Sequence, residues 1–331
     1  MLNETTKNII SFLARIILSA ALLAWLFSKI DTAQMISILK TADLMFIGLA
    51  LFIFLLINLV ILLRWYVLIK ALDLKVSFFD VVRNFFIGLF CNLFLPSAIG
   101  GDIVKAFGLA KNSSQKARVV ASVILDRLIG FASIVLVAIV AFIFGYRFIN
   151  DVSLLWMILI LAVFSSVMFV TLLNEKLFEW ACRIFNRVPK IKSALMDLHY
   201  DIVLIKDKTK DVAWAMGLSC VSQVVLAMIF FLIIKGLNHE VGLVYFFIFS
   251  PLVCVAASLP SVGGLGVREF GWVYFLAKVG VSQDVAVSMS LMSFVFMLIV
   301  GLLGGLIYVT TVSSGRLQHH RPNAALSPKE S

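Results

Sequence analysis

The sequence predicts an all-α protein that crosses a membrane several times. Hydrophobic residues make up 62% of its 331 residues and charged residues only 14%, with a mean hydropathy of +1.07. Soluble domains contain about 45–50% apolar and about 25% charged residues. Long apolar runs recur from end to end of the chain, and two of them are interrupted near the middle by Pro and Gly. These features predict about six spanning helices plus two re-entrant hairpins.

Six apolar segments have the length of a spanning helix, which needs about 20 mostly apolar residues. They are 9–28, 44–63, 118–144, 152–173, 211–234 and 284–310. The first could be mistaken for a signal peptide, but Arg15 interrupts it and no small-residue cleavage site follows. We therefore expect it to be a retained helix.

The two interrupted runs, 84–110 and 242–277, carry the motifs LPSAIGGD and LPSVGGLG. The arm before the first motif has twelve residues, about 18 Å of helix, which reaches about halfway through a hydrocarbon core of about 30 Å. Each run therefore predicts a re-entrant hairpin, with a kinked spanning helix as the alternative. The predicted turn residues are Pro96, Gly100, Gly101, Pro260, Gly263, Gly264 and Gly266.

The similarity of the two motifs indicates an internal repeat. Both read Leu-Pro-Ser followed shortly by Gly-Gly, 164 positions apart. Lys and Arg gather in 64–83, 102–118 and 174–210 and in the tail, which places these segments and both termini in the cytoplasm. The units 44–144 and 211–310 then become inverted copies, an arrangement typical of transporters.

The rest of the chain adds no second folded domain to the membrane domain expected at 1–312. Apolar residues recur at helical spacing in the polar insert 174–210, which predicts two amphipathic helices at the cytoplasmic interface; a plain connector is the alternative. The polar residues 313–331 predict a disordered cytoplasmic tail.

Charged residues inside the apolar segments are the candidate binding residues. They are Asp126, Arg127, Arg268, Glu269, Asp102 and Lys105. Charges at such depth are costly, so they usually face the protein interior or a wet cavity and have partners. We expect Asp126 or Arg127 to reach a charged residue near one of the hairpin turns. Such a cluster predicts an anion site for a lipid headgroup; structural ion pairs and caps of the hairpin tips are the alternative. Arg64-Trp65 is interpreted as an interfacial anchor.

Other classes of function lack support in the sequence. The net charge of +10 comes from basic residues between apolar segments, which indicates contact with a membrane rather than with nucleic acid. The four Cys and four His residues form no ligand-like cluster, so we expect no metal site and no cofactor. Catalytic and nucleotide-binding motifs are missing as well, and we do not expect an enzyme.

Several motifs resemble the flippase-like membrane region of the lysylphosphatidylglycerol synthases. They are Arg64-Trp65, GLFCNLFLP at 88–96, GGD at 100–102, SVILDRLIG at 122–130 and LPSVGGLGVRE at 259–269. The resemblance covers about 1–312. It implies movement of lipids between leaflets. It does not extend to aminoacyl transfer, which in that family belongs to a cytosolic domain that the short tail cannot supply.

Together these observations predict translocation of an anionic phospholipid or lipid-linked intermediate across the bacterial inner membrane. Arg127 and Arg268 would contact the phosphate, and Asp126 and Glu269 would hold these arginines or meet a cationic group. Asp102 and Lys105 would line the first, cytoplasmic hairpin. The alternatives are a membrane-embedded transferase acting on a lipid-linked donor and a non-catalytic scaffold for envelope-synthesis enzymes. The expected partners are lipids with anionic headgroups and enzymes of envelope or glycolipid synthesis.

Overall fold

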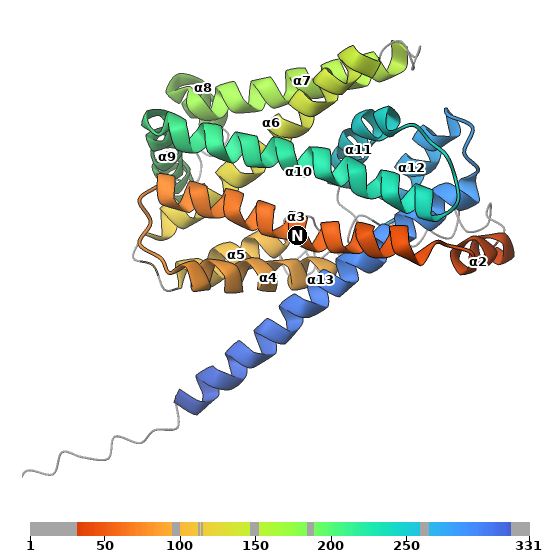
Figure 1. Cartoon of the computed structure of the whole chain (residues 1–331). Helices are drawn as coiled ribbons and strands as arrows, with labels where there is room; N and C mark the ends of the chain where they lie inside the picture. Colours follow the sequence, from red (N-terminus) through yellow and green to blue (C-terminus); the bar gives the residue numbers. More distant parts are fainter. Residues whose placement is uncertain are drawn as a thin grey trace, which may run out of the picture.

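The computed structural model describes residues 32–94, 100–111, 113, 115–145, 152–183, 189–258 and 265–318. Over these residues the chain consists of helices joined by turns and short connections (Figure 1). Five described helices are long and apolar enough to cross a membrane: α3 (Leu44–Ala71), α6 (Lys116–Gly145), α7 (Val152–Leu173), α10 (Thr209–Gly236) and α13 (Gln283–Gln318). They confirm the predicted all-α multi-pass fold. The span predicted at 9–28 lies outside the described residues.

Both interrupted runs fold as helical hairpins rather than as kinked helices. The first consists of α4 (Phe78–Phe94) and α5 (Gly100–Ala110), and the second of α11 (Leu243–Ala257) and α12 (Val267–Ala277). In each hairpin the two arms pack against each other. α4 begins six residues before the predicted arm, so its 17 residues extend about 26 Å, clearly more than half of a hydrocarbon core.

The predicted turn residues are only partly described. Gly100 and Gly101 form the first turn of α5. Gly266 precedes α12 with a φ of 85°, which favours glycine, and its backbone N–H donates to Glu269 Oε2 at 2.7 Å. Pro96, Pro260, Gly263 and Gly264 lie outside the described residues.

Glycine is required where α4 and α5 meet. A Cβ on Gly88 would lie 2.8 Å from the carbonyl oxygen of Gly101, which is a backbone atom and cannot rotate away. The two backbones therefore approach more closely than any side chain would allow, and this contact fixes how the first hairpin closes.

Gly88→Ala should lower the free energy of unfolding by about 1–3 kcal/mol, the usual cost of overpacking. Gly48→Ala is the matched control, because a Cβ at Gly48 on the helix α3 would meet no atom within 4 Å. It should be neutral or stabilising by up to about 1 kcal/mol. Equilibrium unfolding in mixed detergent and SDS measures both, and equal stabilities for the two variants would contradict the close packing.

The chain contains two units of the same element order. α3, α4, α5 and α6 form the first unit, and α10, α11, α12 and α13 form the second. The units exchange partners, since α4 packs on α13 and α11 packs on α6. α3 runs along α10 in the opposite direction (Figure 1), and the backbone N–H of Asp43 donates to the carbonyl of Gly236 at 2.7 Å. Reciprocal packing of this kind arises when two units are related by an approximate two-fold axis.

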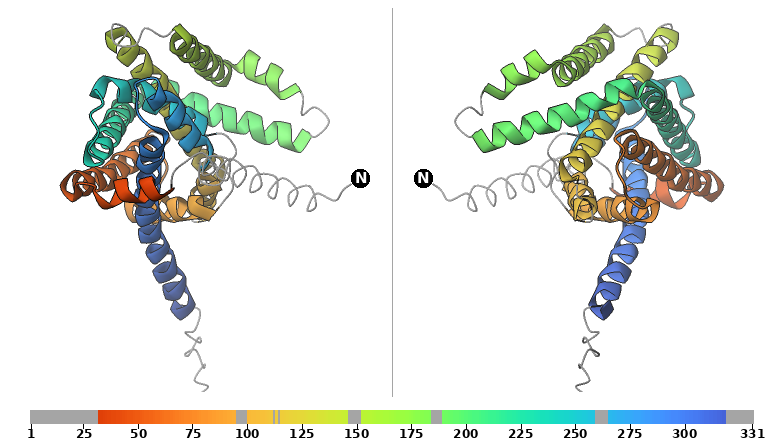
Figure 2. Two further views of the ribbon diagram at one scale, coloured as in Figure 1. Left: turned by 90° about the vertical axis from the view of Figure 1, so that its right-hand side faces the viewer. Right: turned by 90° about the vertical axis from the view of Figure 1, so that its left-hand side faces the viewer.

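The insert after α7 forms α8 (Glu175–Ala181), α9 (Pro189–Val203) and a short 3₁₀ turn at Leu204–Asp207. α9 packs on α6, where Arg118 Nε donates to Asp201 Oδ1 at 3.1 Å. A further helix, α2 (Thr32–Lys40), precedes α3. The C-terminal part of α13 projects beyond the other helices (Figure 2). It continues to Gln318, six residues into the segment predicted as a disordered tail.

Candidate functional site

A polar cavity of about 290 Å³ lies among α3, α4, α5, α6, α10 and α11. Five charged side chains line it: Arg64, Asp102, Lys105, Asp126 and Arg127. Asn58, Asn92, Ser222 and Gln223 add polar groups, and the remaining walls are largely apolar or formed by glycine. The charges come from three helices, α3, α5 and α6, so only the folded bundle assembles them.

Arg64 of α3 binds both a carboxylate and a hydroxyl. Its Nε donates to Asp126 Oδ1 at 2.7 Å and its Nη1 donates to the hydroxyl of Ser219 on α10 at 2.8 Å. The hydroxyls of Ser219 and Ser133 lie 2.7 Å apart. Only 8% of Arg64 is exposed. A Cβ on Gly130 would lie 3.4 Å from Arg64 Nη1, so a larger residue there would crowd the guanidinium.

Lys105 of α5 lies between the two carboxylates. Its Nζ is 3.0 Å from Asp102 Oδ1 and 3.4 Å from Asp126 Oδ2. The same ammonium lies 4.7 Å from the ring centroid of Trp65, a cation–π contact, and Trp65 Nε1 donates to the hydroxyl of Ser122 at 3.2 Å. Trp65 is fully buried. The buried Trp65 ring therefore holds the Lys105 ammonium in place from one side.

Arg127 of α6 is the third and most exposed cation of the cavity lining. Its Nε donates to Asp102 Oδ2, and 40% of its side chain is exposed, against 8% for that of Asp102. Asp126 and Arg127 are neighbours on α6 but point in directions about 100° apart. They therefore contact different partners, and Asp126 does not hold Arg127.

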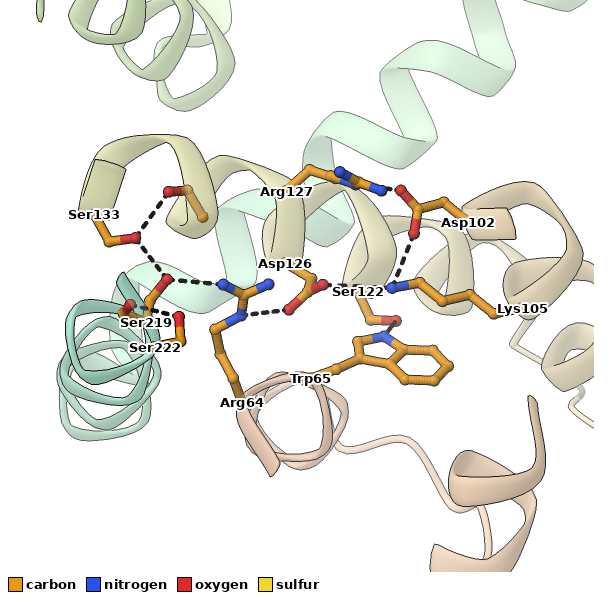
Figure 3. A network of polar contacts seen from close by, with 11 residues as sticks. Arg64, Trp65, Asp102, Lys105, Ser122, Asp126, Arg127, Ser133, Ser219 and Ser222 are labelled. Carbon is orange, nitrogen blue, oxygen red and sulfur yellow. Dashed lines mark hydrogen bonds and ion pairs between the residues drawn. The ribbon is translucent and has the colours of Figure 1, made fainter. Parts of the chain in front are cut away.

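The five groups alternate in sign along a chain of contacts that bends back on itself at Lys105, in the order Arg64, Asp126, Lys105, Asp102 and Arg127 (Figure 3). Each carboxylate is shared by two cations. Three cations and two carboxylates give this lining a net charge of +1. The two carboxylates already hold the three cations in place, so an anion could bind without a rearrangement of these side chains.

A second charged cluster lies between α12 and α13. Arg268 Nη2 donates to Glu269 Oε1 at 2.7 Å, and Arg268 Nε donates to the hydroxyl of Ser290 at 3.0 Å. Its guanidinium also lies 5.5 Å from the ring centroid of Phe294. Glu269 is fully buried, and its Oε2 caps the N-terminus of α12. Neither residue belongs to the described lining of the cavity.

The structure thus brings together four of the six predicted binding residues. Asp126 is within salt-bridge distance of Lys105, and Arg127 is paired with Asp102, as expected for partners near the first hairpin turn. Arg268 and Glu269 pair with each other. A phosphate held jointly by Arg127 and Arg268 stays a prediction.

Comparison with known proteins agrees with the geometry. The sequence family described as the lysylphosphatidylglycerol synthase TM region matches residues 12–305. The chain belongs to this family. A UPF0104 membrane protein from Pyrococcus horikoshii is 25% identical over 303 residues, which cover 82% of this chain and 89% of that protein. No solved structure matches the chain. Both hairpins and the cavity lie within the part matched by the synthase TM region family.

Arg64 is the charged cavity residue of this family member that sequence reasoning missed. An interfacial anchor should lie at a helix end, but α3 continues for seven residues beyond Arg64, to Ala71, and Arg64 is buried. The sequence contains the relevant signal, since the apolar run Tyr66 to Ile69 follows the arginine. A charge inside a continuing apolar helix needs a buried partner, and Asp126 provides it.

Proposed function

We propose that the protein moves lipids with an anionic headgroup between the two leaflets of its membrane. The observation that carries this proposal is a net positive, polar cavity set among helices long enough to cross a bilayer. A charged group placed in the hydrocarbon core is disfavoured by about 2.5–3.5 kcal/mol on translocon scales. Fixed cations and amides replace lost water and lower that barrier.

The size of the cavity supports the same proposal. Its 290 Å³ lies just below the range for ligand pockets, about 300–1,000 Å³. This volume suits a headgroup but not a whole lipid. The acyl chains would therefore stay in the bilayer while the headgroup passes, and the motion would need no ATP hydrolysis by the protein itself.

The location and the partners form part of the proposal. We place the protein in the inner membrane of the cell with both termini in the cytoplasm, because Lys and Arg gather in the segments that this orientation leaves there. Lipids with anionic headgroups are the proposed ligands, and enzymes of envelope or glycolipid synthesis would supply or consume them.

Cysteine labelling tests the orientation. In a variant whose four native cysteines are replaced by Ser, Lys192→Cys on α9 should react with an impermeant maleimide only after the cells are opened. Asn238 lies in the exposed turn after α10, whereas α9 precedes α10, so the two labelled positions lie near opposite ends of α10. Asn238→Cys should therefore react in intact cells. The reverse pattern would contradict the proposed orientation.

Leaflet exchange in proteoliposomes tests the function directly. Purified protein should accelerate the exchange of a fluorescent anionic phospholipid above the rate in empty liposomes, read by quenching the outer leaflet with dithionite. A membrane-embedded transferase would instead change the mass of a lipid-linked donor. A scaffold would neither exchange lipid nor change the mass of the donor, so the exchange rate and the donor mass together separate the three functions.

A further inference from the structure

The ion pairs among the described lining residues of the cavity set the charge balance of this lining. Asp126 is bound by Arg64 and Lys105, and Asp102 by Lys105 and Arg127, so the surplus is one positive charge. Arg268 and Glu269 form a neutral pair, and counting them leaves the surplus unchanged. The hairpin segments 95–99 and 259–264 contain no ionisable residue.

A single surplus charge has a consequence for selectivity. Uncompensated charge is costly in a region of low dielectric constant, and the cost rises with the net charge that remains. A headgroup of charge −1 makes the occupied cavity neutral. A phosphomonoester carries about −1.5 to −2 at pH 7 and leaves the occupied cavity negative.

We infer that the cavity selects lipids whose headgroup is a monoanionic phosphodiester over lipids that carry a phosphomonoester dianion. This inference rests on the proposed function and narrows it to a substrate class. We assign the selectivity to Asp102. Its carboxylate lies beside the exposed Arg127 and offsets one of the positive charges that a headgroup would meet there.

Three nearly isosteric substitutions change the cavity charge, one by raising it and two by lowering it. Asp102→Asn raises the surplus to two positive charges. Asn92→Asp removes the surplus, and its new carboxylate keeps the acceptor that binds the backbone N–H of Gly101 at 2.8 Å. Gln223→Glu also removes the surplus positive charge. Gln223 lines the cavity, and its Oε1 is buried with no hydrogen-bond partner among the described residues. The latter two variants test the inference even if Asp102→Asn does not fold.

The experiment compares phosphatidylglycerol, a phosphodiester, with phosphatidic acid, a phosphomonoester, as fluorescent probes in zwitterionic proteoliposomes at pH 8. The wild type should exchange phosphatidylglycerol about tenfold faster, the effect of one uncompensated charge at an effective dielectric constant near 20. Asp102→Asn should abolish or reverse this preference. Asn92→Asp and Gln223→Glu should slow exchange of both lipids.

The outcomes separate the inference from the proposed function. Equal wild-type rates for the two lipids, an unchanged preference in folded Asp102→Asn protein, or undiminished exchange in folded Asn92→Asp and Gln223→Glu proteins would overturn the inference alone. Strong competition by glycerophosphoglycerol, which has the phosphodiester but no acyl chains, would overturn the assignment to a lipid-borne headgroup. A wild-type protein that exchanges neither lipid would overturn the proposed function and the inference together.

Discussion

Replacing Asp126 by Asn should lower the free energy of unfolding by about 3–5 kcal/mol, the usual cost of leaving a buried charge without its partner. The carboxylate binds two cations at once, Arg64 at 2.7 Å and Lys105 at 3.4 Å. Both cations are at least nine-tenths buried, so water can replace the Asp126 carboxylate only in part. In the variant, Lys105 still contacts Asp102 and Arg64 still donates to Ser219. These contacts reduce the loss of stability but do not abolish it.

Equilibrium unfolding in mixed detergent and SDS measures this loss. Asp201→Asn is the matched control, since it makes the same chemical change in the partly exposed ion pair with Arg118, and it should cost about 0–1 kcal/mol. The double variant Arg64→Gln/Asp126→Asn should lose less than the sum of the two single variants, because residues in one network couple. A strictly additive double variant would show that the pair contributes no coupling energy.

The fold could be predicted from the sequence because its determinants are local. An apolar run of about 20 residues specifies a spanning helix wherever it occurs, and Pro and Gly interrupt the two hairpins whatever surrounds them. Helix ends were less accurate. α3 extends beyond 63 and α4 begins before Asn84, because charged and aromatic residues at these ends were assigned to loops or interfaces although helices accommodate them.

The ion pairs could not be predicted residue by residue because tertiary packing decides them. Charge inside an apolar segment correctly indicated that Asp126 and Arg127 needed partners. Which partner each one binds depends on how α3 and α5 pack against α6, and this information is spread over the whole interface. The glycine contact between α4 and α5 is one part of it, since it sets how the first hairpin closes.

Replacing Arg127 by Gln should slow lipid exchange by about ten- to a hundredfold, the effect of losing one hydrogen bond between charged groups, worth about 1.5–3 kcal/mol. Arg127 is the most exposed cation of the series, with 40% of its side chain accessible. A headgroup can therefore reach it without displacing Arg64 or Lys105. The loss should be kinetic rather than structural, because partly exposed ion pairs contribute little to stability.

Arg127→Lys distinguishes charge from geometry at this position. It should restore part of the exchange rate, since lysine keeps the positive charge but lacks the planar, bidentate guanidinium. Arg268→Gln provides the contrast from the second cluster. Glu269 and Ser290 hold Arg268 outside the described lining of the cavity, so this variant should lose stability more than exchange rate. Folded Arg127→Gln protein that moves phosphatidylglycerol at the wild-type rate would exclude Arg127 as a headgroup contact, and its pair with Asp102 would then have a structural role alone.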